Sequence, residues 1–413
     1  MHLNKIIIRT STIPLSLNIL LKGQLKYLNK KFEIIGISSN GIELNEVKSR
    51  EGIKTIAVDM ERGISPLKDL YSLFKLYVNF IKEKPTVVHS ITPKAGLLTM
   101  LAGKMAGVPI RMHTFTGLIF PSKTGLLQKL LIKMDQLLCW SATNIYPEGN
   151  GVKNDLINYN ITSKPLKVLA NGNVNGIDLV NFSKSNILEE QLNLLKQELQ
   201  IAANDFVFVF VGRLVGDKGI NELVEAFQKL EIRDQKLGIS SEPQISSLQS
   251  PISNSQSRIP KLLLVGPLET ELDPLKEETL KEIELNKNII SVGFQKDVRP
   301  YFAISNALVF PSYREGFPNV VMQAGAMELP SIVSDINGCN EIIVEGENGT
   351  IIPVKKAEAI TVAMQKLMED KDYYLSLKNN ARPMVQARYE QSVVWNALLD
   401  EYNMLIKKLD IKN

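Results

Sequence analysis

Two segments in the second half of the chain combine charged side chains with turn residues. Residues 211–219 read Val-Gly-Arg-Leu-Val-Gly-Asp-Lys-Gly and place Gly212, Arg213 and Lys218 between an apolar run and a helical pattern starting at Ile220. Glycines let the backbone approach an anion, a helix N-terminus offers unpaired N–H groups, and the two cations add charge. The segment predicts a diphosphate site, although an ordinary strand-to-helix turn with solvated charges would have the same composition.

The second segment, residues 311–319, follows the apolar run 307–310 and ends in Glu-Gly-Phe-Pro-Asn. Its glycine and proline favour a turn, and Asn319 can begin a helix. The carboxylate of Glu315 suits sugar hydroxyls, and Gln323 follows eight residues later on the same helical pattern. We expect both side chains to face one ligand, while a helix-capping Glu315 and a surface Gln323 remain the alternative.

A third loop is expected at Asp335–Glu341, where Gly338 permits a close backbone approach and Glu341 begins a helix, although a plain turn fits equally.

In the first half, His89 and His113 each end an apolar run. Either histidine could act in chemistry or be a buried, hydrogen-bonded structural residue. The three histidines of the chain have no acidic partners at ligand spacing, so no metal site is predicted.

Short apolar runs alternate with helical patterns along the whole chain, which is typical of βαβ units and a parallel sheet. The expected strands are 5–8, 32–36, 55–58, 87–89, 110–113, 142–146, 167–169, 206–211, 262–265, 289–292, 307–310, 332–333 and 350–352. They predict an α/β protein with two doubly wound, Rossmann-like parallel-sheet domains facing each other across a cleft.

The predicted domains are residues 1–180 and 181–390, followed by a C-terminal helix, 391–413, that packs back toward the first domain. Residues 240–258 contain eight serines and are predicted to form a mobile surface insertion. Asp370-Lys371-Asp372 has the Asp-x-Asp pattern of metal-dependent transferases, but it lies between helical patterns and is interpreted as a turn.

The charge is distributed unevenly over the 413 residues. Residues 1–180 contain 23 Lys and Arg against 12 Asp and Glu, whereas the remainder contains 25 against 32. The first domain is therefore expected to approach an anionic surface or substrate, with functionless drift in surface lysines as the alternative. The lysine-containing amphipathic stretch 118–138 is the candidate contact with an anionic membrane, unless it is a buried helix.

Two cysteines without metal or redox spacing favour a reducing cytoplasm. Arg9, Ser11 and Pro14 interrupt the apolar N-terminus, which predicts a strand in place of a signal peptide. No apolar run approaches the roughly 18 residues of a membrane span. We therefore expect a cytoplasmic protein that meets the inner face of the plasma membrane peripherally.

The order of these segments over two α/β halves resembles a retaining glycosyltransferase of family 4, with the GT-B architecture, of the type that serves bacterial capsule, O-antigen or exopolysaccharide synthesis. The resemblance is strongest from Val211 to Ile352. It implies a hexosyltransferase that uses a nucleoside-diphosphate sugar, such as a UDP-hexose or UDP-N-acetylhexosamine, and a lipid-diphosphate-linked or saccharide acceptor. It implies neither a metal nor another cofactor, and no nucleic-acid partner.

The resemblance also assigns roles. Arg213 and Lys218 would hold the diphosphate and Glu315 the sugar hydroxyls, so these three are the catalytic candidates. Further donor contacts would come from Gly212, Gln295, Gly316, Phe317, Pro318, Asn319 and Gln323. Gln323 replaces a usual glutamate, and Thr116 replaces the histidine of a Thr-x-His-Gly string. The acceptor side would include His89, Lys94, His113, Thr116 and Gly117.

Two other functions fit the same pattern. A nucleotide-sugar epimerase would need paired carboxylates in the first half, and no convincing pair is present. A noncatalytic sugar-nucleotide-binding partner of another transferase would explain the two replacements, but Arg213, Lys218 and Glu315 oppose it. Donor turnover by the purified protein would separate an enzyme from such a partner.

Overall fold

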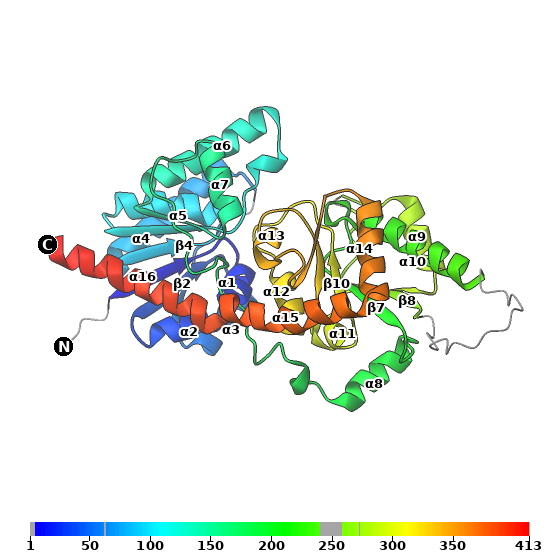
Figure 1. Cartoon of the computed structure of the whole chain (residues 1–413). Coiled ribbons are helices and arrows are strands. Elements are labelled where there is room, and N and C mark those ends of the chain that lie inside the picture. The colour runs from blue at the N-terminus through cyan, green and yellow to red at the C-terminus, as the bar shows by residue number, and fades with distance from the viewer. Residues whose placement is uncertain (1–4, 62, 240–257, 272, 413) are drawn as a thin grey trace, which may run out of the picture. The chain divides into compact units, whose positions relative to one another are not determined.

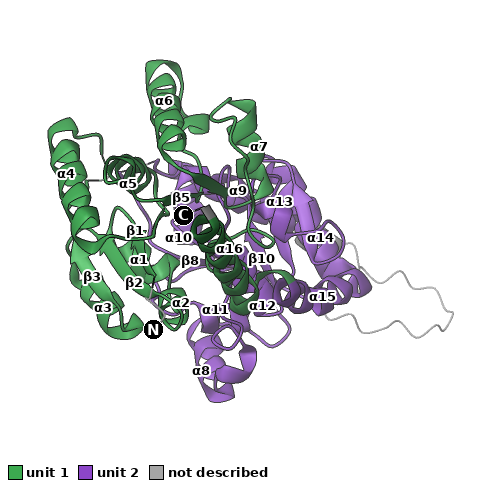
Figure 2. Ribbon diagram, turned by 90° about the vertical axis from the view of Figure 1, so that its left-hand side faces the viewer, with its two compact units in different colours: residues 1–176, 388–413 green, residues 177–387 purple. Residues whose placement is uncertain are grey.

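The computed structural model describes residues 5–61, 63–239, 258–271 and 273–412, so residues 240–257 of the predicted insertion lie outside the described part. The chain divides into two compact units. Unit 1 comprises Met1–Gly176 and Arg388–Asn413, and unit 2 comprises Ile177–Ala387 (Figure 2). The boundaries predicted from the sequence lie a few residues further along the chain.

Unit 1 contains a six-stranded parallel sheet in the order β3-β2-β1-β4-β5-β6. Apolar, largely β-branched runs form its central strands because both faces of a parallel sheet are covered by helices. The strands are β1 (Ile6–Thr10), β2 (Glu33–Ser38), β3 (Lys54–Ala57), β4 (Val87–Ser90), β5 (Ile110–Phe115) and β6 (Asn144–Pro147).

Two hydrophobic cores flank this sheet. One face packs against α4 (Pro66–Glu83), α5 (Pro93–Met105), α6 (Gly125–Ser141) and α7 (Asn150–Asn158). The other packs against α1 (Pro14–Leu20), α2 (Gln24–Asn29), α3 (Ile42–Glu51) and the C-terminal helix α16 (Gln391–Lys412), which lies along α2 (Figure 1). Tyr402 of α16 is fully buried in this second core.

Unit 2 repeats the architecture with the strand order β12-β11-β10-β7-β8-β9. Its strands are β7 (Phe206–Val211), β8 (Pro260–Val265), β9 (Ile289–Ser291), β10 (Ala307–Phe310), β11 (Ser331–Ser334) and β12 (Gly349–Ile352). Its helices are α8 (Glu189–Glu198), α9 (Ile220–Ile239), α10 (Glu277–Leu285), α11 (Arg299–Ala303), α12 (Asn319–Ala326), α13 (Cys339–Ile342) and α14 (Ala357–Glu369), and α15 (Lys371–Tyr389) leads from it into unit 1. The two parallel sheets confirm the predicted α/β class.

The predicted strand at 167–169 is wrong. Only Leu166 pairs there, through a single bridge to Ile145. Pro147, two residues after Ile145 at the end of β6, has no amide hydrogen to continue the ladder, so the pairing does not extend. Within the described residues, no helix is both long enough and apolar enough to cross a bilayer.

Candidate functional site

The strand order of unit 2 reverses direction between β7 and β10, which are direct neighbours. Ligands of open parallel sheets bind at such a point, because the loops leaving the carboxyl ends of the two strands diverge there. The segment 211–219 leaves β7 and the segment 311–319 leaves β10. The two segments singled out in the sequence are therefore brought to the same position at the edge of one sheet.

The two loops touch through their backbones. Gly219 has a φ of 71°, and a Cβ atom there would lie 2.2 Å from the carbonyl oxygen of Pro311. Only glycine fits this left-handed position at so close an approach. The Tyr313 amide also donates a hydrogen bond to the carbonyl oxygen of Asp217, at 2.9 Å. These contacts fix the two loops against each other.

Lys218 and Glu315 form an ion pair between the loops, in which Lys218 Nζ donates to Glu315 Oε1. Ser312 Oγ donates to the same carboxylate oxygen at 3.0 Å. Only 16% of the Lys218 side chain and 18% of the Glu315 side chain are exposed. Little water screens this pair, so a cation and a carboxylate of appreciable electrostatic strength lie together at the reversal point.

Arg213 has a different partner. Its Nη1 lies 2.9 Å from Glu269 Oε2, on the loop after β8, and both side chains are substantially exposed. Because exposed ion pairs contribute little free energy, Arg213 can exchange this carboxylate for another anion at small cost. Glu269 was not predicted as a site residue, although it follows an expected strand and the same rule would have found it.

The helix α12 begins at Asn319, as predicted, and follows Pro318. Glu315 does not cap this helix, because its carboxylate is paired with Lys218. Gln323 lies on the second turn of α12 and is partly exposed. The alternative of a capping Glu315 is therefore wrong, whereas contact of Gln323 with a ligand stays a prediction.

The loop 335–341 packs against the turn after Glu315. Gly338 has a φ of 75°, and a Cβ atom there would lie 2.5 Å from the carbonyl oxygen of Gly316. The helix α13 begins at Cys339, two residues before the predicted start at Glu341. Burial raises the pKa of the Cys339 thiol well above its ordinary value, and the nearby charge of Glu315 raises it further. The thiol is therefore neutral.

Gln295 lies just beyond β9, where its side-chain amide donates to the Val292 carbonyl oxygen at 2.8 Å. It lines a cavity of about 550 Å³ together with residues of α8 and α11. The neighbouring Phe294 is 73% exposed. The predicted contact of Gln295 with the donor stays a prediction, and its side-chain amide is already engaged with the backbone.

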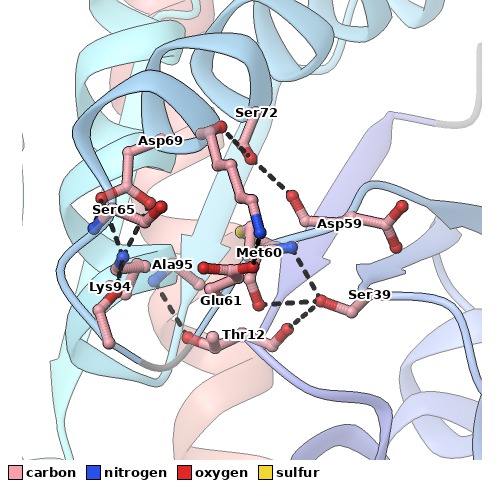
Figure 3. Close-up of polar contacts among 12 residues, drawn as sticks. Thr12, Ser39, Asp59, Met60, Glu61, Ser65, Asp69, Ser72, Lys94 and Ala95 are labelled. Carbon is pink, nitrogen blue, oxygen red and sulfur yellow. Dashed lines mark hydrogen bonds and ion pairs between the residues drawn. The ribbon is translucent and has the colours of Figure 1, made fainter.

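In unit 1 the strand order reverses between β1 and β4. Lys94, near the start of α5, lies at this point, and its Nζ donates to both carboxylate oxygens of Asp69 at 2.6 and 2.8 Å (Figure 3). Thr12, after β1, accepts a hydrogen bond from the Ala95 amide at 3.2 Å. The predicted Lys94 thus occupies the position at which this sheet would bind a ligand, with its charge balanced by Asp69.

His89 and His113 are both buried and hydrogen-bonded within unit 1. The His89 ring contacts the Tyr402 and Thr114 hydroxyls at 2.6 and 2.8 Å, and His113 Nδ1 lies 2.8 Å from the Ser90 hydroxyl. Burial lowers the pKa of His113 to about 3, and burial with the charge of Arg9 lowers that of His89 well below its ordinary value. Both rings are therefore neutral, and a direct contact with an acceptor would require their exposure.

Thr116 and Gly117 follow β5. The Thr116 hydroxyl donates to the Ile91 carbonyl oxygen at 2.9 Å, and Gly117 has a φ of 125°. Both residues are partly exposed. In the described part of the chain, no group of three or more His, Cys, Asp or Glu side chains is arranged to hold a metal ion.

The family model, the relatives and the solved structure described below are all glycosyltransferases. The family model "Glycosyl transferases group 1" matches residues 193–384. The chain is 31% identical to the capsular polysaccharide biosynthesis glycosyltransferase CapM of Staphylococcus aureus, over 95% of this chain and 96% of that protein. It is 27% identical to the Escherichia coli UDP-Gal:alpha-D-GlcNAc-diphosphoundecaprenol alpha-1,3-galactosyltransferase, over 77% of this chain and 75% of that protein.

Among solved structures, a glycosyltransferase from Rickettsia africae superimposes with a TM-score of 0.76. The alignment covers 98% of this chain and all of that one, at 19% sequence identity. This likeness extends over both units and confirms the predicted GT-B fold.

Proposed function

Since the chain belongs to the glycosyl transferases group 1 family, we propose that it is a retaining hexosyltransferase of surface polysaccharide synthesis. The donor is a nucleoside-diphosphate sugar, a UDP-hexose or UDP-N-acetylhexosamine, and the acceptor is a lipid-diphosphate-linked or plain saccharide. Support for the process comes from CapM, and support for the two substrates comes from the galactosyltransferase whose name contains UDP-Gal and a diphosphoundecaprenol.

The observation that carries the proposal is the pair of Lys218 and Glu315 at the strand reversal of unit 2. When the bond between the sugar and the diphosphate breaks, negative charge develops on the phosphate oxygens. Lys218 and Arg213 stabilise that charge, and the N-terminal end of α9 adds its dipole. Glu315 accepts hydrogen bonds from sugar hydroxyls once Lys218 has turned to the phosphate.

The anomeric configuration of the sugar is retained because the acceptor attacks the sugar from the same face that the diphosphate leaves. The bond between the acceptor oxygen and the anomeric carbon forms as the bond to the phosphate oxygen breaks, and the released phosphate oxygen takes the acceptor proton. No side chain of this protein is then needed as a base. Because Lys218 and Arg213 supply the positive charge, we propose that the reaction proceeds without a metal ion.

The acceptor side belongs to unit 1, where Lys94 lies at the strand reversal. We assign the stretch 118–138 to peripheral contact with the anionic inner face of the plasma membrane, which places the enzyme in the cytoplasm. Leu126 is 85% and Leu130 is 47% exposed, so the first half of α6 is not a buried helix. Lys129, between them, is exposed as well.

The proposal is tested with the purified chain in two steps. Thermal unfolding is measured with a panel of nucleotide sugars, since a ligand that binds only the folded state raises the midpoint. The stabilising donor is then supplied with a diphosphate-linked saccharide, and the anomeric configuration of the product is read by NMR. Inversion would refute the mechanism, and binding without any transfer would identify a noncatalytic partner.

A further inference from the structure

The helix α4 of unit 1 has two apolar faces, and only one of them packs against the sheet. Its buried residues are Ser72, Leu76 and Phe80, spaced four apart. At about 100° per residue these three lie on one side of the helix. Leu76 and Phe80 pack into the core of unit 1. The partly buried Leu73 and Tyr77 pack against the same core.

The second apolar face points to solvent. Six side chains form it, and their exposed fractions are 85% for Leu67, 64% for Leu70, 60% for Tyr71, 58% for Phe74, 42% for Val78 and 48% for Ile81. On a helical projection they fall within an arc of about 100°, opposite the core-facing residues. With Met105 of α5, the first part of this face encloses a groove of about 480 Å³. Contiguous exposed apolar surface of this kind marks an interaction site.

A stripe of lysines borders the face. Lys68, Lys75 and Lys82 recur every seven residues, project between the outward apolar face and the core face, and are all exposed. Lys68 is paired with Glu61, while Lys75 lies over the ring of Tyr71, 5.2 Å from its centroid. An apolar face with lysines along one border is the pattern of a helix that lies in a membrane interface, its ammonium groups at the lipid phosphates.

The position of the face connects it to the acceptor side. It begins at Leu67, two residues before the Asp69 that holds Lys94 at the strand reversal (Figure 3). Helices α4, α5 and α6 cover the same side of the sheet, so α4 and α6 belong to one layer of helices (Figure 1).

We propose that the outward face of α4 is the surface by which this protein docks on an anionic lipid bilayer. The apolar side chains enter the interface and the lysine stripe binds lipid phosphates. This rests on the proposed function for its biological setting, and it adds α4 to the membrane contact assigned above to the stretch 118–138. Docking through this face requires no conformational change in unit 1, because the apolar side chains are already exposed.

The test measures cosedimentation of the full chain with phosphatidylcholine vesicles, with and without phosphatidylglycerol. Leu70→Ser with Phe74→Ser should weaken binding to the anionic vesicles more than about tenfold, and Lys75→Gln with Lys82→Gln about fivefold per lysine. The matched control is Val362→Ser, because Val362 on α14 of unit 2 is 53% exposed and should be neutral.

A second comparison uses Leu126→Ser with Leu130→Ser on α6. Loss of binding by the α4 variants supports the proposal, whether or not the α6 variant also loses some. Undiminished binding of the α4 variants, or no binding by the unmodified chain at low salt, would overturn it. A dimer that the α4 substitutions dissociate would also overturn it, since a second copy would then be the occupant.

The substituted side chains are exposed, so unfolding midpoints should not change. Vesicle binding is measured without nucleotide sugar, and transfer to a water-soluble acceptor is measured separately. If the docking proposal alone is wrong, the α4 variants bind vesicles undiminished and sugar transfer is still observed. If the proposed function alone is wrong, the unmodified chain transfers no sugar but still binds vesicles through α4.

Discussion

Replacement of Lys218 by alanine removes the less exposed of the two cations assigned to the donor diphosphate. Its ammonium is already desolvated against Glu315, with 16% of the side chain exposed, so its interaction with developing phosphate charge is weakly screened. Loss of one such transition-state contact costs about 3–4 kcal/mol, or roughly 100- to 1000-fold in rate. We therefore expect kcat/KM for transfer to fall at least about 100-fold in Lys218→Ala.

The assay is the initial rate of sugar transfer at low donor concentration, with donor binding measured separately by calorimetry. Lys229→Ala is the matched control, because Lys229 also belongs to unit 2 and pairs with a carboxylate, Glu225, but is 43% exposed. It should retain full activity.

Glu315→Ala should also lose about 100-fold, because its sugar contacts and the partner of Lys218 disappear together. The double variant should lose less than the product of the two single effects, since the side chains interact directly. Transfer rates within about threefold of the unmodified chain in Lys218→Ala would refute the assignment of the diphosphate site.

Four further outcomes are expected. Glu269→Gln should tighten binding of the nucleoside diphosphate product about two- to fivefold, because the Glu269 carboxylate no longer competes with the diphosphate for Arg213. Calorimetry measures this affinity, and an unchanged value would contradict the prediction. Gly338→Ala should lower the unfolding midpoint and the transfer rate, because its Cβ would lie 2.5 Å from the Gly316 carbonyl oxygen, and an unchanged midpoint would show that the loop can move aside. The folded-state pKa of His113, about 3, lies below the ordinary value of 6.5. Between these two values the unfolded chain binds a proton that the folded chain excludes. The stability that is present above pH 6.5 is therefore lost as the pH falls. Urea unfolding should then show about 2 kcal/mol less stability at about pH 5 from this residue, with flat stability as the contrary result. Transfer should persist at full rate in a chelator, and dependence on an added metal would overturn the proposed mechanism.

Much of the candidate site could be predicted because ligands of parallel sheets bind where strands end. Lys218 and Glu315 each follow an apolar run of the kind that forms a buried strand, and this is visible in the sequence. Glu269 satisfies the same rule and was overlooked. The partner of each charge could not be predicted from the sequence, because Arg213 and Glu269 are 56 positions apart and no local pattern relates them.

The histidines illustrate a limit of the residue patterns. A histidine at the end of a strand suits catalysis and burial equally. His89 contacts Tyr402 from a distance of 313 positions, on a helix whose packing no local pattern specifies. Its neutral, enclosed state is a consequence of that packing.

The sequence alone determined the alternation of strands and helices, and with it the parallel sheets, because hydrophobic periodicity reflects burial within each element. It also placed the charged turns at strand ends. Only the tertiary structure decided that β10 pairs with β7, which brings Lys218 to Glu315 across 97 positions, and which of the two apolar faces of α4 meets the core. Strand order and the choice of face depend on packing between distant segments, and a local pattern does not contain that information.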